Sequence, residues 1–305
     1  MSSAPEPPPP RRSLRGDWWT LAKPGITALI CLVAVGGFLL ARPSSVDLVR
    51  LGLVVGFGAL ASAGSGMLNH TLERDRDRAM RRTRSRPLAA ERIDPRVTAA
   101  VGLAFVAVGV GGASLTLNVL TGVSILLGAV TYVVVYTAWL KPRSSWNIVI
   151  GGFAGSAPAL AGGAAAVGAW TPGVLVFALL VFLWTPPHFW SLALLLKDDY
   201  ARAGLPMLPR MDDVGFSGKV VAFSAALLVP PSVLVAILGP VAWPVGVAIV
   251  GLAVGFVAVT WPLWREVDAR RARRGFLYSG PYLIGVVLAL VVNVPLLHLG
   301  FAPRL

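Results

Sequence analysis

Six stretches of at least 18 residues contain no Asp, Glu, Lys or Arg, and together they cover most of this 305-residue chain. They are residues 24–41, 51–72, 97–140, 144–196, 220–264 and 275–303. A soluble domain usually carries about 25% charged residues, whereas this chain carries 13% and is 56% hydrophobic. A water-soluble core could not hide so many apolar side chains, but a lipid bilayer can surround them. The sequence therefore predicts an all-α, polytopic membrane protein.

The lengths of these stretches predict the number of helices. A membrane-spanning helix needs about 20 apolar residues, so the first, second and last stretches each predict one helix. The other three contain 44, 53 and 45 residues, which is enough for two helices each. Each of these has Gly together with Pro or Asn near its middle, at 111–118, 168–173 and 239–246, where a turn is expected. We therefore predict a bundle of nine transmembrane helices.

The basic residues predict how the bundle is oriented, because Lys and Arg concentrate in cytoplasmic loops. Of the 27 Lys and Arg residues, 24 fall in the N-terminal segment and in alternate loops. Only Arg42, Arg50 and Arg304 fall on the opposite side. We therefore expect the N-terminus in the cytoplasm and the C-terminus outside.

The N-terminal segment 1–16 is rich in Pro and contains Arg11, Arg12 and Arg15. We predict that it forms a disordered cytoplasmic tail and that residues 17–305 form a single transmembrane domain. The net charge of +13 does not indicate a nucleic-acid partner, because the arginines lie in short loops between the predicted spans.

Acidic residues gather on the same predicted side, which holds 13 of the 14 Asp and Glu residues. Asn69, Glu73 and Asp77 are four residues apart, so on a helix they share one face. Two carboxylates and an amide oxygen suit Mg²⁺, especially when a phosphate completes its shell. Guanidinium groups bind phosphate oxygens, and seven arginines interleave with or follow this group: Arg74, Arg76, Arg78, Arg81, Arg82, Arg84 and Arg86. The spacing alone fits equally a diphosphate–metal site and a positively charged membrane anchor whose acids pair with arginines.

A second acidic group, Lys197-Asp198-Asp199-Tyr200, follows the sixth predicted helix on the same side. Such a group could face the first across a cavity and hold a second metal ion. Without the first group it would be interpreted as an ordinary interfacial loop.

Two further residues have alternative interpretations. His188 follows two prolines inside a predicted span, and a histidine in that position is a candidate metal ligand, haem contact or proton shuttle. It could instead bond the carbonyl groups that the prolines leave free. Lys141, after the fourth predicted helix, could contact phosphate or serve only as a charge that sets the orientation.

Residues 73–88 read Glu-Arg-Asp-Arg-Asp-Arg-Ala-Met-Arg-Arg-Thr-Arg-Ser-Arg-Pro-Leu. Together with Asn69 they resemble the NxxxDxxxD motif of the UbiA superfamily of intramembrane prenyltransferases. More narrowly, they resemble the DRDxDxxMxRTxxRPL signature of the protohaem IX farnesyltransferase (haem O synthase) family. Residues 136–141, 187–190 and 199–209 are similar to that family too, so the resemblance covers nearly the whole chain. The chain departs from the pattern at Glu73, where the family usually has Asp.

The resemblance implies a UbiA-like bundle that transfers the farnesyl group of farnesyl diphosphate to a vinyl group of haem B, giving haem O and diphosphate. It implies Mg²⁺ as cofactor and a bacterial cell membrane location with the active site facing the cytoplasm. Haem A synthase or terminal oxidase subunits are the implied protein partners. The implied metal ligands are Asn69, Glu73, Asp77 and Asp198, with Asp199 as a further catalytic residue. The implied substrate-binding residues are Arg81, Arg86, Tyr136, Lys141, His188, Lys197 and Tyr200.

Two alternatives remain at this point. One is another UbiA-type prenyltransferase that acts on a quinone precursor or chlorophyllide. The other, from a different class, is a membrane transporter. Transporters place charged or unwound elements near the bilayer midplane, whereas this chain concentrates its charges at one predicted face.

Overall fold

The computed structural model describes residues 13–41, 46–80, 82–202, 204, 206, 208 and 213–301, and every regular element in these residues is a helix. Within them, nine helical segments are long and apolar enough to cross a membrane, which confirms the predicted number. These segments are Pro24–Ala41 (α2), Leu48–Ala79 (α3), Pro95–Thr116 (α4), Val119–Leu140, Asn147–Val167, Pro172–Leu195 (α8), Val214–Leu238, Trp243–Trp264 and Ala269–His298 (α13).

Four of the nine segments consist of two consecutive helices. These pairs are α5 (Val119–Val130) with the π-helix η1 (Thr131–Leu140), α6 (Asn147–Gly151) with α7 (Phe153–Val167), α10 (Val214–Ala226) with α11 (Val229–Leu238), and α12 (Trp243–Thr260) with the 3₁₀-helix η2 (Trp261–Trp264). Two short helices lie outside the spans, α1 (Leu14–Leu21) and α9 (Lys197–Arg202).

Each of the three long charge-free stretches forms two spans, and the turn between them lies where Gly or Asn occurs near the middle of the stretch. Asn118 begins α5 by accepting a hydrogen bond from the Thr121 backbone N–H at 2.9 Å. Gly168 ends α7 with a φ of 73°, a left-handed conformation that glycine adopts without strain. A break at Gly239 separates α11 from α12. All three turns therefore lie in the predicted ranges.

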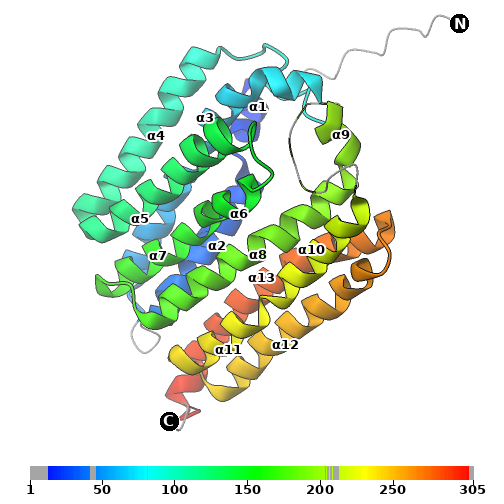
Figure 1. The fold of residues 1–305 in the computed structure, drawn as a ribbon. Coiled ribbons are helices and arrows are strands. Elements are labelled where there is room, and N and C mark those ends of the chain that lie inside the picture. Colours follow the sequence, from blue (N-terminus) through cyan, green and yellow to red (C-terminus); the bar gives the residue numbers. More distant parts are fainter. Residues whose placement is uncertain are drawn as a thin grey trace, which may run out of the picture.

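The helices pack with α4 and α5 on one side of the bundle and α10, α12 and α13 on the other, while α2, α7 and α8 lie between them (Figure 1). The largest cluster of buried apolar residues is formed by α2, α7, α8, α11, α12 and α13. Helices α1 and α9 lie at one end of the bundle, and α13 finishes at the opposite end (Figure 1). This arrangement leaves the chain's polar segments gathered near α1 and α9.

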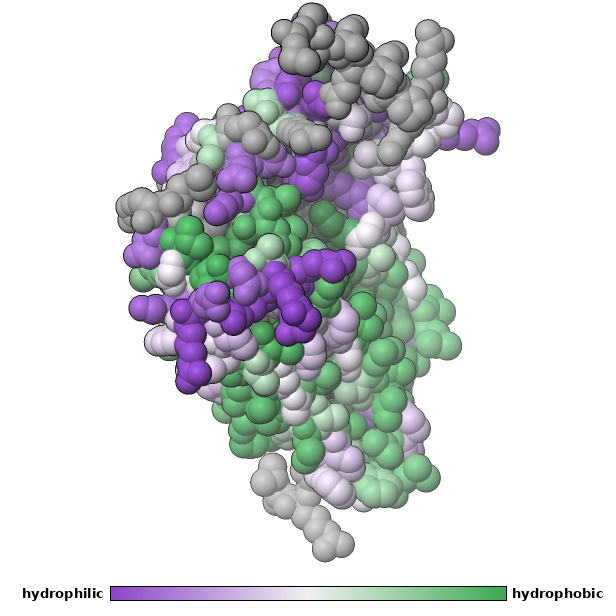
Figure 2. Space-filling view, turned by 90° about the vertical axis from the view of Figure 1, so that its right-hand side faces the viewer, coloured by the Kyte–Doolittle hydropathy of each residue, from purple (hydrophilic) through white to green (hydrophobic). Residues whose placement is uncertain are grey.

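The molecular surface agrees with a membrane environment. On the face in Figure 2, hydrophobic residues cover most of the lower part and hydrophilic residues gather above them. The exposed apolar side chains include Val247 on α12 and Leu288 on α13, which are 65% and 54% exposed. Side chains of this kind are stable on a surface that lipid covers.

The predicted N-terminal tail differs from the structure at its end. Residues 1–12 lie outside the described residues, whereas residues 14–16 belong to α1. Ser13 caps this helix by accepting a hydrogen bond from the Gly16 backbone N–H, and Asp17 anchors it. The Asp17 carboxylate is 1% exposed and accepts hydrogen bonds from Arg92 Nε and Nη2 at 2.9 and 2.8 Å. Their hydrogen bond raises the pKa of the Arg92 guanidinium. The helix is therefore fixed by a local cap and by an ion pair whose two members are far apart in sequence.

Two glycines allow α2 and α7 to cross with their backbones in contact. A Cβ atom on Gly37 would lie 2.1 Å from the Ala159 carbonyl oxygen, and a Cβ on Gly162 would lie 2.0 Å from the Ala34 carbonyl oxygen. Small residues at such crossings bring membrane helices close together. This crossing fixes the position of α2 relative to the rest of the core.

Replacing Gly162 by alanine is expected to lower the free energy of unfolding by about 1–3 kcal/mol, because the added methyl group forces α2 and α7 apart. Thermal unfolding followed by circular dichroism in detergent would measure this loss. Gly56 on α3 is the matched control, because a Cβ there meets no atom within 4 Å. Gly56→Ala should be neutral or slightly stabilising, since alanine favours the helix. Equal midpoints for both variants would contradict the tight crossing.

Candidate active site

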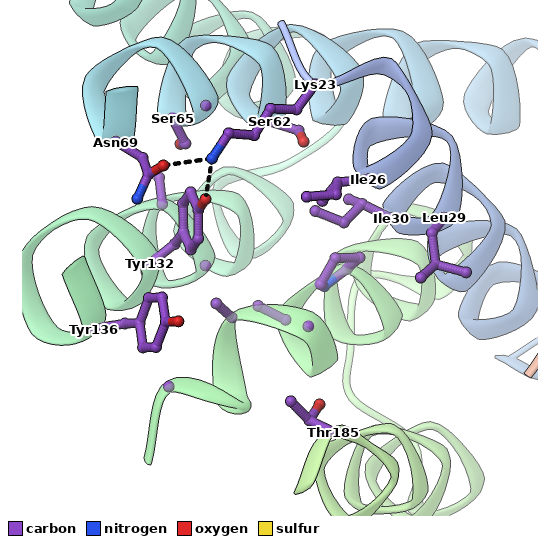
Figure 3. Close-up of a pocket in the computed structure, with 18 of the residues that line it drawn as sticks. Lys23, Ile26, Leu29, Ile30, Ser62, Ser65, Asn69, Tyr132, Tyr136 and Thr185 are labelled. Carbon is purple, nitrogen blue, oxygen red and sulfur yellow. Dashed lines mark hydrogen bonds between the residues drawn. The ribbon is translucent and has the colours of Figure 1, made fainter. Parts of the chain in front are cut away.

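A cavity of about 420 Å³ lies between α2, α3, α5–η1, α6–α7 and α8. Its lining residues on α3 follow one face of the helix from Asp77 back to Val54. At about 1.5 Å per residue, this face is about 35 Å long. Near Asp77 the cavity is lined by charged and polar side chains, and further along by apolar ones such as Ile26, Leu29 and Ile30 of α2 (Figure 3).

Asn69 is the first of three oxygen-bearing side chains on this face of α3, and it is 1% exposed. Its Nδ2 donates a hydrogen bond to Thr137 Oγ1 at 2.9 Å, which orients the amide. Its Oδ1 accepts a hydrogen bond from Lys23 Nζ, and Lys23 also donates to the Tyr132 hydroxyl at 2.8 Å (Figure 3). Asn69 therefore presents its amide oxygen to a cation.

Glu73, one turn further along α3, is 3% exposed and accepts a hydrogen bond from Lys141 Nζ. Lys141 is itself 9% exposed, and its ammonium group lies 5.6 Å from the centre of the Tyr136 ring. A lysine with so little exposure needs a charged partner, because burying an unpaired charge is costly. The two residues therefore form a buried ion pair on the cavity wall.

Asp77, the third of these side chains, is 1% exposed. Arg86 Nη1 donates to both of its carboxylate oxygens at 2.9 Å. The loop that carries Arg86 is fixed by Thr83, whose Oγ1 donates to the Asp77 backbone carbonyl at 3.0 Å. Each of these three side chains of α3 therefore faces a cation from a different segment of the chain.

The π-helix η1 explains why Lys141 lies near two tyrosines. Its backbone is wound with bonds between residues five apart, as in the hydrogen bond from the Lys141 N–H to the Tyr136 carbonyl at 2.8 Å. This winding places residues four and five apart on one face, so Tyr132, Tyr136 and Lys141 all line the cavity. The rings of Tyr132 and Tyr136 stack with centroids 6.0 Å apart. In a regular α-helix, residues five apart would diverge.

Lys23 is a site residue that sequence reasoning used only to orient the chain. It joins α1 to α2 with a φ of 50°, in the left-handed region. Burial lowers the pKa of its ammonium group to about 7. One signal was present in the sequence, because a cation just before a helix N-terminus opposes the helix dipole and needs another explanation. Thr137 was also missed, because an α-helical period does not place residues five apart on one face with Tyr132. Tyr132 was missed although it lies four residues before Tyr136, a spacing that an α-helical period does select.

The structure brings together most of the predicted site residues. Those that line the cavity are Asn69, Glu73, Asp77, Arg86, Tyr136, Lys141, His188 and Tyr200. Arg82 also lines it, whereas Arg81 lies outside the described residues.

The second acidic group is divided by the short helix α9. Tyr200 is 6% exposed and faces the cavity, and burial raises the pKa of its phenol. Lys197, Asp198 and Asp199 are not among the described residues that line the cavity, and Asp198 is exposed. Residues two apart on a helix lie on nearly opposite faces, so an inward Tyr200 turns Asp198 outward.

The donor set of the α3 face fits a hard cation that a phosphate group also binds. Glu73 and Asp77 supply carboxylate oxygens, and Asn69 supplies an amide oxygen. Mg²⁺ is usually held by one or two carboxylates plus substrate phosphates. The described residues contain no group of three or more His, Cys, Asp or Glu side chains suited to a metal. A cage made only of protein ligands is therefore absent from this part of the chain.

Comparison with known proteins identifies close sequence relatives. Residues 29–280 match the sequence model of the UbiA prenyltransferase family. The chain is 40% identical over 281 residues to the Protoheme IX farnesyltransferase of Sulfurisphaera tokodaii, covering 90% of this chain and 92% of that protein. It is 38% identical over 293 residues to the Protoheme IX farnesyltransferase of a Synechocystis species, covering 92% and 90%.

Solved structures share the fold at low sequence identity. The structure of a UbiA homolog from Archaeoglobus fulgidus bound to GPP and Mg²⁺ superposes with a TM-score of 0.68 at 17% identity, covering 90% of this chain and 99% of that one. A digeranylgeranylglyceryl phosphate synthase superposes with a TM-score of 0.75 at 18% identity, covering 92% and 98%.

Proposed function

We propose, from the premise that this chain belongs to the UbiA prenyltransferase family, that it transfers the farnesyl group of farnesyl diphosphate to a vinyl group of haem B. The carbon–oxygen bond to diphosphate breaks and a carbon–carbon bond to the vinyl group forms. Water then adds to the resulting cation and loses a proton, which gives the hydroxyethylfarnesyl side chain of haem O. The observation that carries the proposal is the row of three cations facing three oxygen ligands at the polar end of an apolar cavity.

The three cations suit a leaving diphosphate. Lys23, Arg86 and Lys141 all line the polar end of the cavity. Negative charge grows on the leaving oxygens as the allylic bond breaks, and fixed cations in a buried site stabilise that charge. A hydrogen bond to Asn69 and ion pairs with Glu73 and Asp77 hold these cations in position before substrate arrives.

Asn69, Glu73 and Asp77 would hold Mg²⁺, and the bound ion would neutralise part of the diphosphate charge. This proposal is supported by the donor chemistry of the α3 face and by the UbiA homolog structure bound to GPP and Mg²⁺. Glu73 replaces the usual aspartate with a longer side chain, and Lys141 meets it at the cavity wall. Asp198 is exposed and is not among the described residues that line the cavity, so the proposed metal site consists of Asn69, Glu73 and Asp77.

The apolar part of the cavity accommodates the isoprenoid chain. Ile26 and Leu29 of α2 and Val54 of α3 are among the residues that line it. Apolar walls exclude water from the allylic cation until it reaches the acceptor. The stacked faces of Tyr132 and Tyr136 stand near the diphosphate end, where aromatic faces stabilise positive charge.

We place the polar end of the cavity on the cytoplasmic side of a bacterial plasma membrane. The support is the concentration of Lys and Arg in alternate loops. Farnesyl diphosphate then approaches from the cytoplasm and the inner leaflet. Haem O is proposed to pass to haem A synthase or to a terminal oxidase subunit.

Removing divalent metal is expected to lower farnesyl transfer by at least about 100-fold, because part of the charge stabilisation on diphosphate is lost. Purified protein in lipid nanodiscs would receive farnesyl diphosphate and haem B with Mg²⁺, with EDTA, and with EDTA followed by excess Mg²⁺. Mass spectrometry would detect haem that has gained one farnesyl group and one hydroxyl group.

The identity of the acceptor is tested in a separate experiment that compares three candidate acceptors. Haem B, a hydroxybenzoate quinone precursor and chlorophyllide would each be offered with labelled farnesyl diphosphate. We expect label in haem. Preferential labelling of either other acceptor would assign the chain to a different reaction within the family. Unchanged transfer in EDTA would overturn the metal assignment alone.

A further inference from the structure

The cavity has a second polar feature, the imidazole of His188 on α8. Thr185, one turn earlier on α8, lies across the cavity from Lys23 and Asn69 in Figure 3. The His188 ring stacks against Trp184 and against Phe276, with centroid distances of 4.4 and 5.2 Å and interplanar angles of 16° and 29°. These two contacts restrict rotation of the imidazole.

A hydrogen-bond chain fixes the tautomer of this imidazole. His188 Nδ1 lies 2.5 Å from Ser279 Oγ, and Ser279 Oγ donates to the Phe276 carbonyl oxygen at 2.6 Å. A serine hydroxyl has a single hydrogen, and the carbonyl contact uses it. The hydrogen between the imidazole and the serine must therefore come from Nδ1. Nε2 then carries a lone pair.

Ser279 is itself held in place. Trp184 Nε1 donates to its backbone carbonyl at 2.9 Å, and Ser279 is 0% exposed. Within the described residues Nε2 of His188 forms no hydrogen bond, and His188 lines the cavity. The arrangement is that of a metal-binding histidine, in which one ring nitrogen donates to a fixed oxygen and the other is free to ligate.

The surroundings restrict which metal could bind. The described residues offer no set of three His, Cys, Asp or Glu side chains that would hold a bare ion. A metal that arrives inside a macrocycle brings its own ring of ligands and needs only one from the protein.

We infer that His188 Nε2 binds the iron of the haem acceptor as an axial ligand, and that Ser279 is the positioning residue that fixes the required tautomer. This inference rests on the proposed function, because it takes haem B as the acceptor. Holding the porphyrin at its centre leaves its vinyl-bearing edge free to turn toward the diphosphate end of the cavity.

Haem binding without the prenyl substrate tests the ligand directly. Ferric haem B and metal-free protoporphyrin IX would be titrated into the full-length protein in nanodiscs. His188→Ala is expected to weaken haem B binding by about 100-fold and to remove the histidine-ligated absorption spectrum, while binding of protoporphyrin IX changes little. Added imidazole should restore the spectrum. An equal loss for both ligands would mean that His188 contacts the ring and not the iron, and would overturn the inference.

To test the positioning role of Ser279, the measurement must respond to its hydrogen bond with the imidazole and not to a general change in packing. Ser279→Ala should retain the axial ligand, shift the iron–histidine stretching band in resonance Raman spectra of ferrous haem, and weaken haem binding by about tenfold. Ser279→Thr should restore the wild-type band. Ser224 is the matched control, because its buried hydroxyl bonds only the Val221 carbonyl of its own helix. A wild-type band in Ser279→Ala would overturn the positioning role.

The axial-ligand inference and the proposed function can be contradicted by different results. If the wild type farnesylates haem B and His188→Ala keeps the wild-type haem spectrum, the axial-ligand inference is wrong and the proposed function stands. If the wild type neither binds nor farnesylates haem B, the proposed function is wrong and the inference falls with it.

Discussion

Replacing Asp77 by asparagine is expected to lower kcat for farnesyl transfer by at least about 100-fold while the protein keeps its fold. In the wild type, Arg86 donates to both carboxylate oxygens of Asp77 at 2.9 Å. Asparagine at this position can still accept one of these hydrogen bonds. It removes the negative charge that Mg²⁺ requires and the charge that holds the guanidinium at the cavity wall. Initial rates of haem O formation, together with thermal unfolding midpoints, would separate these effects.

Asp75 supplies a matched control for this variant. It lies two residues earlier on α3, is 73% exposed, and forms ion pairs with Arg74 and Arg78 outside the cavity. Asp75→Asn should leave the rate and the midpoint nearly unchanged, because exposed ion pairs contribute little. Equal rates for Asp77→Asn and Asp75→Asn would remove Asp77 from the active site.

Replacing Lys141 by methionine is expected to have the largest effect on stability. The side chains of Lys141 and Glu73 are only 11% and 4% exposed, so the substitution leaves a buried carboxylate without its partner. Breaking a buried ion pair in this way costs about 3–5 kcal/mol. The variant should unfold at a markedly lower temperature and should make no detectable haem O. Thermal unfolding in detergent and the mass assay would measure both losses.

A double variant separates the two losses. Lys141→Met with Glu73→Gln removes both charges, so most of the lost stability should return. Activity should stay absent, because the phosphate-binding cation and a metal ligand are both missing. Arg143→Met is the control for losing one nearby cation, since Arg143 is exposed and donates only to the Ala138 and Trp139 carbonyls. Recovery of activity in the double variant would contradict the proposed roles.

The number of spans could be predicted because it depends on one-dimensional facts. A helix must be long enough to cross the bilayer, and charged residues mark where each crossing ends. The irregular winding of η1 could not be predicted in the same way. Residues 131–140 are as apolar as the rest of their span, so composition does not distinguish a π-helix from an α-helix. The helix α1 was missed because its anchor, Arg92, is far away in sequence.

In the candidate site, too, some features could be predicted from the sequence and others depend on tertiary packing. Asn69, Glu73 and Asp77 could be selected by their spacing, because they belong to one helix with a known period. Their partners come from separate segments, and only the packed bundle brings Lys23 to Asn69. The outward position of Asp198, which the resemblance implied as a metal ligand, could not be predicted for a related reason, because the neighbours of a short helix set the direction in which it faces.

The ion pair between Asp17 and Arg92 also links two separate segments of the candidate active site. Asp17 lies on α1, which leads directly to Lys23, and Arg92 belongs to the same loop as Arg86. The segments that carry Lys23 and Arg86, two of the three cations proposed to bind diphosphate, are thereby joined by a buried carboxylate. A displacement of Lys23 away from Arg86 would have to break that ion pair.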